Sequence, residues 1–394
     1  MLQSAPQKIP SIDYRPAQYS ELLEQKAAAI TQLLADFAPP PPEVFDSPKQ
    51  HFRMRTEFRI WHDKQAVGAE IHDIDDSADN DTCHYVMFEP EQPRVPVKIV
   101  DFPIASKAIT AIMTPLLANI NNDKTLKHKL FQVEFLSTTT GQILASLIYH
   151  RQLDEEWKQA AKALEQRLNI FVIGRARKQQ VVLSQDFVVE QLTVNGSTLT
   201  YHQQENSFTQ PNAAINSKMI EWLSDKLSNS HRRSPSVRRD LLELYCGNGN
   251  FTIPLSRHFN NVLATEISKS SIRLASKNCE ANQVNNIEFI RLSSDETAAA
   301  LNQEREFRRL QHIDINDYDF STVLVDPPRA GLDSRTLALV ASFDTIIYIS
   351  CNPNTLADNI QTLSSSHSIA QFALFDQFPY THHCECGLIL QRKA

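Results

Sequence analysis

The sequence predicts an α/β protein of two parts: a C-terminal domain with a doubly wound parallel sheet, and an N-terminal α+β domain. After residue 240, short apolar runs alternate with helical stretches, which is typical of parallel strands joined by crossover helices. Between residues 50 and 205 strand patterns dominate, and helical segments intervene near 104–120 and 154–168. With 394 residues, of which 42% are apolar, the chain can bury more than one core.

The N-terminal domain is predicted to cover residues 1–205 and to begin with a helix at 18–37. Apolar residues recur there at intervals of three and four, and four prolines at 39–42 end the pattern. Strands at 131–136 and 142–149 flank a glycine-containing turn, as in a β-hairpin. Further strands are expected at 52–61, 170–173, 180–183 and 198–202. Together these segments predict an antiparallel sheet with interleaved helices.

The C-terminal domain is predicted to cover residues 206–394. The run Gln210-Pro211-Asn212 opens a helix, because proline is well tolerated in a first helical turn. The polar segment 228–239 that follows is expected to be a loop. Five parallel strands are expected at 241–245, 262–265, 287–291, 322–325 and 345–349.

The net charge of −7 argues against a protein that binds nucleic acid through bulk positive charge. The acids are unevenly placed: residues 63–91 hold nine of them against Lys64 alone, and the run 70–81 is expected to be a solvated loop. Any RNA binding should therefore depend on shape and specific contacts. The six cysteines form no disulfide framework, and no apolar run approaches the length of a membrane span, so a cytoplasmic protein is expected.

A cofactor site is predicted where the strand 241–245 turns into a helix. Gly247 and Gly249 allow the backbone to approach a ligand closely, but the third glycine of a dinucleotide fingerprint is missing. Glu266 ends the next strand, 19 residues after Gly247, where an acid can accept both ribose hydroxyls. The alternative is a solvated charge at a strand end. Together with Asn250, the pattern favours a cofactor without a pyrophosphate, for which S-adenosylmethionine is the natural candidate.

A reacting site is predicted at the same edge of the sheet. Cys351 follows the strand 345–349 and precedes Pro353, which cannot continue a central strand. The thiol is therefore presented at the carboxyl edge, where open α/β sheets bind ligands. Asp326 and Arg329 follow the strand 322–325 through two prolines and reach the same edge. Arg329 could there favour the thiolate form of Cys351.

Glu385 lies in a segment rich in histidine and cysteine near the end of the chain. If it is buried, its pKa is raised, which suits a general base. A zinc site of His382, His383, Cys384 and Cys386 is the alternative. Neighbouring residues of an extended chain point to opposite sides, and a C-x-x-C partner is lacking, so no metal is expected.

A thiol, a base and a methyl donor fit one reaction, the methylation of carbon 5 of uracil. Thiolate addition to carbon 6 makes carbon 5 nucleophilic, so that carbon 5 can attack a methyl donor. A base then removes the hydrogen from carbon 5, and the thiol leaves.

Five motifs of the chain together resemble the RNA uracil-C5 methyltransferases, above all the members that act on tRNA. They are FTQPN at 208–212, LELYCGNGNF at 242–251, DPPR at 326–329, SCNP at 350–353 and HHCE at 382–385. The resemblance implies a Rossmann-like, S-adenosylmethionine-dependent methyltransferase domain behind an N-terminal RNA-binding domain. It further implies methylation of uridine 54 in the T-loop of tRNA, and extends to tmRNA.

The resemblance also implies roles for single residues. Cys351 matches the nucleophile, Glu385 the proton acceptor and Arg329 a position on the substrate side. The cofactor-contacting positions are matched by Gln210, Tyr245, Gly247, Asn250, Glu266 and Asp326. Arg59 and Phe131 fall in segments that resemble RNA-contacting parts of the first domain, although Phe131 could equally be a core residue.

Ribosomal-RNA members of the family carry an additional N-terminal barrel and four cysteines for an iron–sulfur cluster. In this chain Cys83 alone precedes Cys246, so tRNA is favoured and no cluster is expected. Two alternatives stay open at this point. The same chemistry could act on ribosomal RNA or another T-loop-like hairpin, or the protein could remodel RNA by binding alone.

Overall fold

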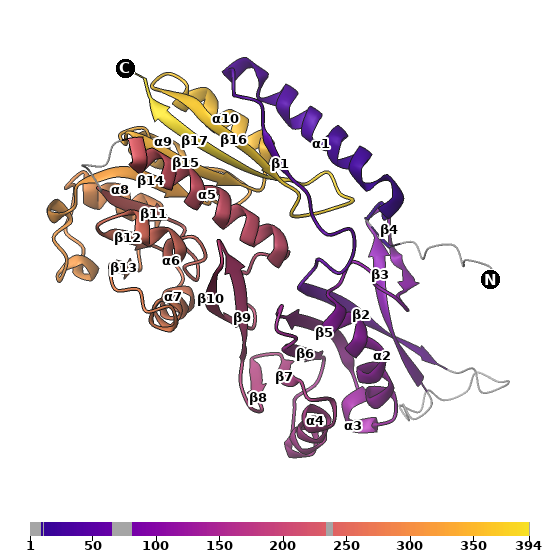
Figure 1. The fold of residues 1–394 in the computed structure, drawn as a ribbon. Coiled ribbons are helices and arrows are strands. Elements are labelled where there is room, and N and C mark those ends of the chain that lie inside the picture. Colours follow the sequence, from indigo (N-terminus) through magenta and orange to yellow (C-terminus); the bar gives the residue numbers. More distant parts are fainter. Residues whose placement is uncertain (1–8, 11, 65–80, 234–238, 394) are drawn as a thin grey trace. The chain divides into compact units, whose positions relative to one another are not determined.

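The computed structural model describes residues 9–10, 12–64, 81–233 and 239–393. The chain forms two compact units (Figure 1). Unit 1 comprises Met1–Pro16 and Lys49–Val189, and unit 2 comprises Ala17–Pro48 and Glu190–Ala394. The larger segment of unit 1, Lys49–Val189, is therefore inserted in sequence between the two segments of unit 2.

Unit 1 contains a seven-stranded sheet of order β4-β3-β2-β5-β6-β7-β8. Its strands are β2 (Arg55–Lys64), β3 (Asp81–Glu89), β4 (Gln92–Lys98), β5 (Leu130–Ser137), β6 (Ile143–Tyr149), β7 (Phe171–Ala176) and β8 (Gln179–Val182). Its helices are α2 (Lys107–Asn121), α3 (Lys124–Lys127) and α4 (Glu155–Leu168). The predicted antiparallel sheet is confirmed except for β6 and β7, which are parallel because α4 carries the chain back between them.

One face of this sheet is buried and the other is exposed, as the alternation along β2 shows. Thr56, Phe58 and Ile60 are buried, whereas Glu57 and Arg59 are exposed. Phe58 contacts the rings of Tyr85, Phe102 and Phe135 in the core. The alternation places Arg59 on the solvent face.

Unit 2 contains an eight-stranded sheet of order β1-β16-β17-β15-β14-β11-β12-β13. Its strands are β1 (Glu43–Phe45), β11 (Asp240–Leu244), β12 (Val262–Thr265), β13 (Ile287–Ile290), β14 (Phe320–Val325), β15 (Thr345–Ser350), β16 (His367–Phe375) and β17 (Glu385–Arg392). The helices are α1 (Tyr19–Leu33), α5 (Ala213–Arg233), α6 (Thr252–Leu255), α7 (Lys269–Ala281), α8 (Ser294–Leu301), α9 (Ser334–Val340) and α10 (Pro353–Leu363). A two-stranded sheet of β9 (Phe187–Val194) and β10 (Ser197–Gln204) stands apart. The five predicted parallel strands are confirmed.

The predicted boundary between residues 205 and 206 differs from the division into units. Residues 17–48 and 190–205 belong to unit 2. The leading helix, predicted at 18–37, ends as α1 at Leu33 and continues as a short 3₁₀ turn. Its residues Ile30 and Leu34 are buried in the core of unit 2, which includes the central strands of the large sheet. β1 pairs in parallel with β16, so this segment completes the sheet edge.

The predicted loop at 228–239 is corrected in its first part, and the predicted loop at 70–81 is corrected at its last residue. The segment 228–239 was expected to be a loop, but α5 continues to Arg233, since polar residues without proline do not stop an established helix. The rest of that segment, 234–238, lies outside the described residues. The acid run 70–81 also lies outside them, apart from Asp81. Asp81 is not a solvated loop residue: it begins β3 and pairs with Lys127 at 3.0 Å.

All six cysteines are free thiols, as expected for a chain without a disulfide framework. Cys351 is half-buried, and the other five are buried. Within the part of the chain that the structure describes, no helix has both the length and the apolar character to cross a membrane.

The strand register brings several chain segments to one edge of the large sheet. Leu244 pairs with both Thr265 and Val325, so β11, β12 and β14 end level with one another. Val325 pairs with Tyr348, and β15 continues two residues further, to Ser350. β17 is antiparallel to β15, and Ser350 pairs with Cys386. The first residue of β17 therefore lies at the edge where the parallel strands end.

Candidate active site

The turn between β11 and α6 is built by three residues in left-handed conformations. Tyr245, Gly247 and Gly249 have φ of 61°, 56° and 84°. A Cβ at Gly247 would meet nothing within 4 Å, whereas one at Gly249 would come within 3.0 Å of Ile253. Gly247 therefore leaves open space where a ligand can approach the backbone, and Gly249 allows close packing of the helix.

Glu266 is tied to this turn. One carboxylate oxygen accepts a hydrogen bond from the Gly247 amide at 3.3 Å, and the other accepts one from the Ser268 amide at 2.8 Å. Each oxygen retains a further lone pair. The carboxylate can therefore still accept two hydroxyl groups, as a ribose site requires.

A pocket at the same sheet edge gathers five of the six predicted cofactor residues: Gln210, Tyr245, Gly247, Asn250 and Asp326. Glu266, the sixth, joins them through its bond to Gly247. The pocket is also lined by Leu192, Tyr201, Gln203, Phe208, Thr209, Asn216, Cys246, Asn248 and Phe251. Amide and carboxylate groups among apolar walls suit a ligand with charged and aromatic parts, as S-adenosylmethionine has.

Asn216 and Gln377 support residues of the pocket and were not predicted from the sequence. Asn216 and Asn250 exchange reciprocal amide hydrogen bonds of 2.8 and 2.9 Å. Gln377 donates to the Gln210 side chain at 2.6 Å. For Asn216, the available signal was its position four residues after Asn212, which directly precedes α5. The contact of Gln377 spans 167 residues and has no local signal.

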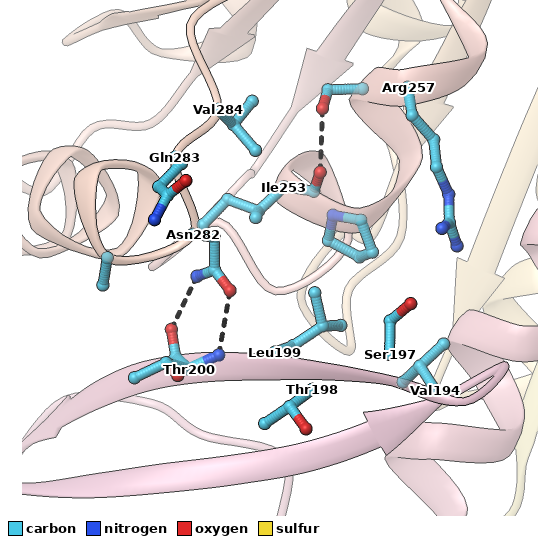
Figure 2. A pocket seen from close by; sticks show the side chains of 13 residues that line it. Val194, Ser197, Thr198, Leu199, Thr200, Ile253, Arg257, Asn282, Gln283 and Val284 are labelled. Atoms are coloured by element: carbon cyan, nitrogen blue, oxygen red, sulfur yellow. Dashed lines mark hydrogen bonds between the residues drawn. The ribbon is translucent and has the colours of Figure 1, made fainter.

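The larger hollow of unit 2, about 350 Å³, lies elsewhere (Figure 2). It is bounded by β10, by α6 and the turn after it, and by the end of α7. Figure 2 shows the Asn282 side chain bonded to both the amide and the carbonyl of Thr200, at 2.9 and 2.7 Å. None of the predicted site residues lines this hollow, so size alone does not identify the site.

The loops that carry Asp326 and Cys351 are tied together. Asn352 caps α10 through its side-chain oxygen, and its amide donates to the Arg329 carbonyl at 2.9 Å. Thr355 donates to the same carbonyl at 3.2 Å. Pro353 occupies the first turn of α10, where a missing amide hydrogen is harmless. The Asn-Pro sequence thus fixes the thiol directly before a helix N-terminus.

Glu385 reaches this site because β17 runs against the parallel strands. It is the first residue of β17, it is 4% exposed, and one carboxylate oxygen has no hydrogen-bond partner among the described residues. A buried, unsatisfied carboxylate oxygen is unusual in a folded protein and is often found at functional sites.

The ionisable groups of the edge shift one another's pKa. Burial and, after it, the charge of Asp326 raise the pKa of Glu385 to about 8, and Arg329 opposes this shift. Burial raises the pKa of Asp326 to about 7. Burial, Glu385 and Asp326 raise the pKa of Cys351 to about 11, and Arg329 lowers it. Arg329 thus favours the thiolate as expected, but burial and the two carboxylates outweigh it.

A further buried carboxyl, Glu243 in β11, was missed because it lies within an apolar strand. Burial, with the charge of Asp326, raises its pKa to about 8. Its Oε2 atom is buried without a hydrogen-bond partner among the described residues. The edge therefore concentrates acidic groups in a dry environment.

The residues of the zinc alternative do not come together as a ligand set in the described structure. The rings of His382 and His383 contact each other, and the Cys384 thiol donates to the Phe375 carbonyl at 3.4 Å. Another group, in unit 1, does bring His62, Asp81 and Cys83 within 4.8 Å of one another. There, the His62 ring lies 2.5 Å from the Asp81 carboxylate, which Lys127 also neutralises. This is the spacing of a hydrogen-bonded ion pair; two ligands at ~2.0 Å from a tetrahedral zinc stand farther apart.

The two predicted RNA-contacting residues lie together on unit 1. The Arg59 guanidinium lies 4.0 Å from the centre of the Phe131 ring, and His150 stacks on Phe131 at 4.0 Å. The pairing of β5 with β6 shifts between Leu130 and Gln132, so a bulge at Phe131 changes the direction of its side chain. Phe131 is half-buried, and the alternative of a core residue is wrong. His150 was missed, since it directly follows β6 and has no periodic signal.

The comparisons with known proteins agree with one another. A family model described as tRNA (Uracil-5-)-methyltransferase matches residues 18–393. The tRNA/tmRNA (uracil-C(5))-methyltransferase of Cellvibrio japonicus is 50% identical over 381 residues, which make up 97% of this chain and 98% of that protein. The protein of the same name from Acinetobacter baylyi is 50% identical over 378 residues, or 95% of this chain and 98% of that protein.

Among solved structures, the tRNA (uracil-54, C5)-methyltransferase of Pyrococcus abyssi, in complex with S-adenosyl-L-homocysteine, matches with a TM-score of 0.69. The two chains are 21% identical, and the match covers 99% of this chain and 88% of that one. At this identity the likeness concerns the fold, and the predicted Rossmann-like methyltransferase architecture is confirmed. Because the family model matches almost the entire length and the relatives are half identical, the chain belongs to the tRNA (uracil-5-)-methyltransferase family.

Proposed function

We propose that this protein methylates carbon 5 of uridine 54 in the T-arm of tRNA, and the equivalent uridine of tmRNA, with S-adenosylmethionine as the methyl donor. One observation carries the proposal: Cys351 and Glu385 reach the same sheet edge as the pocket formed by the glycine turn. The names of the half-identical relatives support the choice of RNA. The reaction takes place in the cytoplasm, where its RNA substrates are found.

Cys351 acts as the nucleophile and Glu385 as the base. The Cys351 thiol gives its proton to solvent, its sulfur bonds to carbon 6 of the uracil, and the electron pair of the carbon 5–carbon 6 double bond moves to make carbon 5 nucleophilic. S-adenosylmethionine supplies the methyl group and a positive charge. Glu385 then takes the proton from carbon 5, the double bond re-forms, and the sulfur leaves as a thiolate.

Burial, Glu385 and Asp326 raise the pKa of Cys351 to about 11, which favours the protonated thiol in the free protein. Bound substrate and cofactor would change these surroundings and so favour the thiolate. Arg329, which is exposed at the same edge and lowers the pKa of both Cys351 and Glu385, can donate hydrogen bonds to the pyrimidine oxygens.

Unit 1 acts as the RNA-binding part and unit 2 as the catalytic part. The row formed by Arg59, Phe131 and His150 offers a cation for phosphate and aromatic faces for stacking with unpaired bases. Loop nucleotides of RNA are recognised in this way more often than paired ones. The T-loop therefore suits this row better than a continuous duplex.

The substrate is tested by offering purified tRNA, tmRNA and ribosomal RNA with labelled methyl donor, and by mapping the product at single-base resolution. We expect label in tRNA and tmRNA, at carbon 5 of the T-loop uridine. Label confined to ribosomal RNA would contradict the proposed substrate while leaving the chemistry intact.

Cys351→Ser should lower methyl transfer by at least about a thousandfold, because a hydroxyl is a far weaker nucleophile than a thiol. The protein with Cys351 should form an adduct with 5-fluorouridine RNA that resists denaturation, since fluorine cannot be removed as a proton, and Cys351→Ser should form none. Cys279→Ser is the matched control: this buried thiol donates to the Val284 carbonyl at 3.0 Å, outside the pocket. An adduct with Cys351→Ser would assign the nucleophile elsewhere.

Release of the methylated RNA from a preformed Cys351 adduct should quicken about tenfold per pH unit below pH 8 and level off above it. Glu385 is a base only when ionised, and burial raises its pKa to about 8. Arg329→Gln removes a positive charge that lowers this pKa, so the profile should move to higher pH.

The control for this measurement is Arg335→Gln. Arg335 is an arginine of α9 that pairs with Asp295 and Glu304. Its replacement should leave the profile in place. A release rate that does not change with pH, or a shift to lower pH in Arg329→Gln, would exclude Glu385 as the base.

Phe131→Ala should weaken tRNA binding about tenfold, in line with the loss of one stacked base, and should leave the affinity for S-adenosylmethionine unchanged. Phe131→Leu, which keeps apolar bulk without an aromatic face, separates stacking from packing and should also weaken binding. Fluorescence or filter-binding titrations measure both affinities. Unchanged tRNA affinity in folded Phe131→Ala would remove this row from the RNA interface.

A further inference from the structure

A buried lysine of α1 holds the loop that leads into Glu385. The Lys26 side chain is 8% exposed, and its ammonium lies 2.6 Å from the Asp376 carboxylate. The same ammonium donates to the carbonyls of Phe378 at 3.1 Å and His383 at 2.9 Å. All three ammonium protons thus have acceptors. Lysine is rarely buried unless it is paired, so this arrangement needs a reason.

The three acceptors lie at the two ends of one loop. Residues 376–384 connect β16 to β17, and Phe375 pairs with Glu385 across the base of the connection. Asp376 is the first residue of the loop, and His383 lies two residues before Glu385. The Lys26 ammonium therefore holds both the first residues of the loop and its last residues, which directly precede Glu385 at the start of β17.

Neighbouring groups from the same end of the chain reinforce this hold. The Tyr19 hydroxyl donates to the other Asp376 oxygen at 2.8 Å and accepts from the Ser47 amide at 2.7 Å. The Asp376 amide donates to the Phe45 carbonyl at 3.0 Å. The Tyr19 ring packs edge-on against Tyr380 in the loop, at 5.7 Å between ring centres. α1 and Phe45 of β1 thus contact the loop at its first residue, Asp376, and α1 also contacts it at Tyr380.

The Glu385 side chain, in contrast, is held by few polar contacts among the described residues. One of its carboxylate oxygens has no hydrogen-bond partner among the described residues, although the residue is buried. A base must lie within hydrogen-bond reach of the proton that it removes. Its position must therefore be imposed by the backbone at the start of β17, which the loop delivers.

We propose that Lys26 is a positioning residue for the base: by fixing both ends of the 376–384 loop, it sets where Glu385 meets carbon 5 of the bound uracil. The inference rests on the role proposed above for Glu385. The nucleophile Cys351 is placed separately, by β15 and the cap of α10. Loss of Lys26 should therefore slow proton removal and leave addition of the thiol nearly intact.

Three variants separate positioning from plain stability. Lys26→Met keeps the apolar stem but leaves the Asp376 carboxylate buried and unpaired, which is destabilising. The double variant Lys26→Met with Asp376→Asn removes that unpaired charge along with the ion pair. Lys26→Arg keeps the charge, but its planar fork cannot reach three converging acceptors equally well. Lys218→Met, at an exposed lysine paired with Asp46, is the control.

The experiment follows single turnovers on tRNA that carries tritium at carbon 5 of its uridines, with excess S-adenosylmethionine. The denaturant-resistant Cys351–RNA adduct reports addition, and tritium released to water reports proton removal. For the double variant we expect adduct formation within about threefold of normal, tritium release at least about tenfold slower, and accumulation of the adduct. Lys26→Arg should recover part of the release rate, and Lys218→Met should behave normally. Titration of S-adenosylmethionine detects any change transmitted through Gln377 to Gln210.

The results of these variants test the positioning role of Lys26 directly. Normal release in the folded double variant, or equal slowing of addition and release, would overturn the positioning role. If the methionine variants do not fold, the test depends on Lys26→Arg. Normal tritium release by folded Lys26→Arg would also exclude the positioning role of Lys26. Glu385→Gln, run in parallel, tests the premise: if it accumulates no adduct, the proposed base fails irrespective of Lys26.

Discussion

The site depends on the antiparallel insertion of β17 between β15 and β16. Parallel strands present only their carboxyl ends at the ligand edge, so a purely parallel sheet would offer the residues that follow each strand and no others. β17 reverses this and presents its first residue, Glu385, at that edge. The pairing of Ser350 with Cys386 then places Glu385 opposite the end of the strand that delivers Cys351. The proposed nucleophile and the proposed base thus come from neighbouring strands of opposite direction, which backbone hydrogen bonds hold together.

Three carboxyl groups that burial shifts in pKa lie at this same edge of the sheet. Glu243, Asp326 and Glu385 are all shifted toward the protonated form by burial, and the charge of Asp326 raises the pKa of both glutamates. Such a set is unfavourable for the free protein, because each carboxylate that ionises makes the next harder to ionise. A positively charged ligand relieves this repulsion. The arrangement therefore favours a cationic cofactor over a neutral one by electrostatics alone, apart from any shape of the pocket.

Much of the site was predictable because its signals are local. The glycine turn, Glu266, Asp326 and Cys351 each follow an apolar run, and the structure brings them to one edge as the strand pattern indicated. Contacts between distant segments were not predictable in this way. The membership of α1 in unit 2, the bond between Gln377 and Gln210, and the Lys26 contacts depend on tertiary pairing, which leaves no periodicity in the sequence. His150 shows the same limit, since one residue beyond a strand end carries no pattern that indicates stacking.

The discontinuity of unit 2 has a consequence for how the protein is made. Lys26 and Asp376 are separated by 350 residues, and the whole of residues 49–189 lies between them. At a synthesis rate of about 5–20 residues per second, α1 leaves the ribosome roughly 20–70 seconds before its partners in the loop exist. Unit 1 can complete its sheet during that interval, whereas the amphipathic α1 must wait with its apolar face unburied. Glu385 can therefore be set in place only after the loop 376–384 has been made, and a nascent chain cannot complete the proposed reaction before that point.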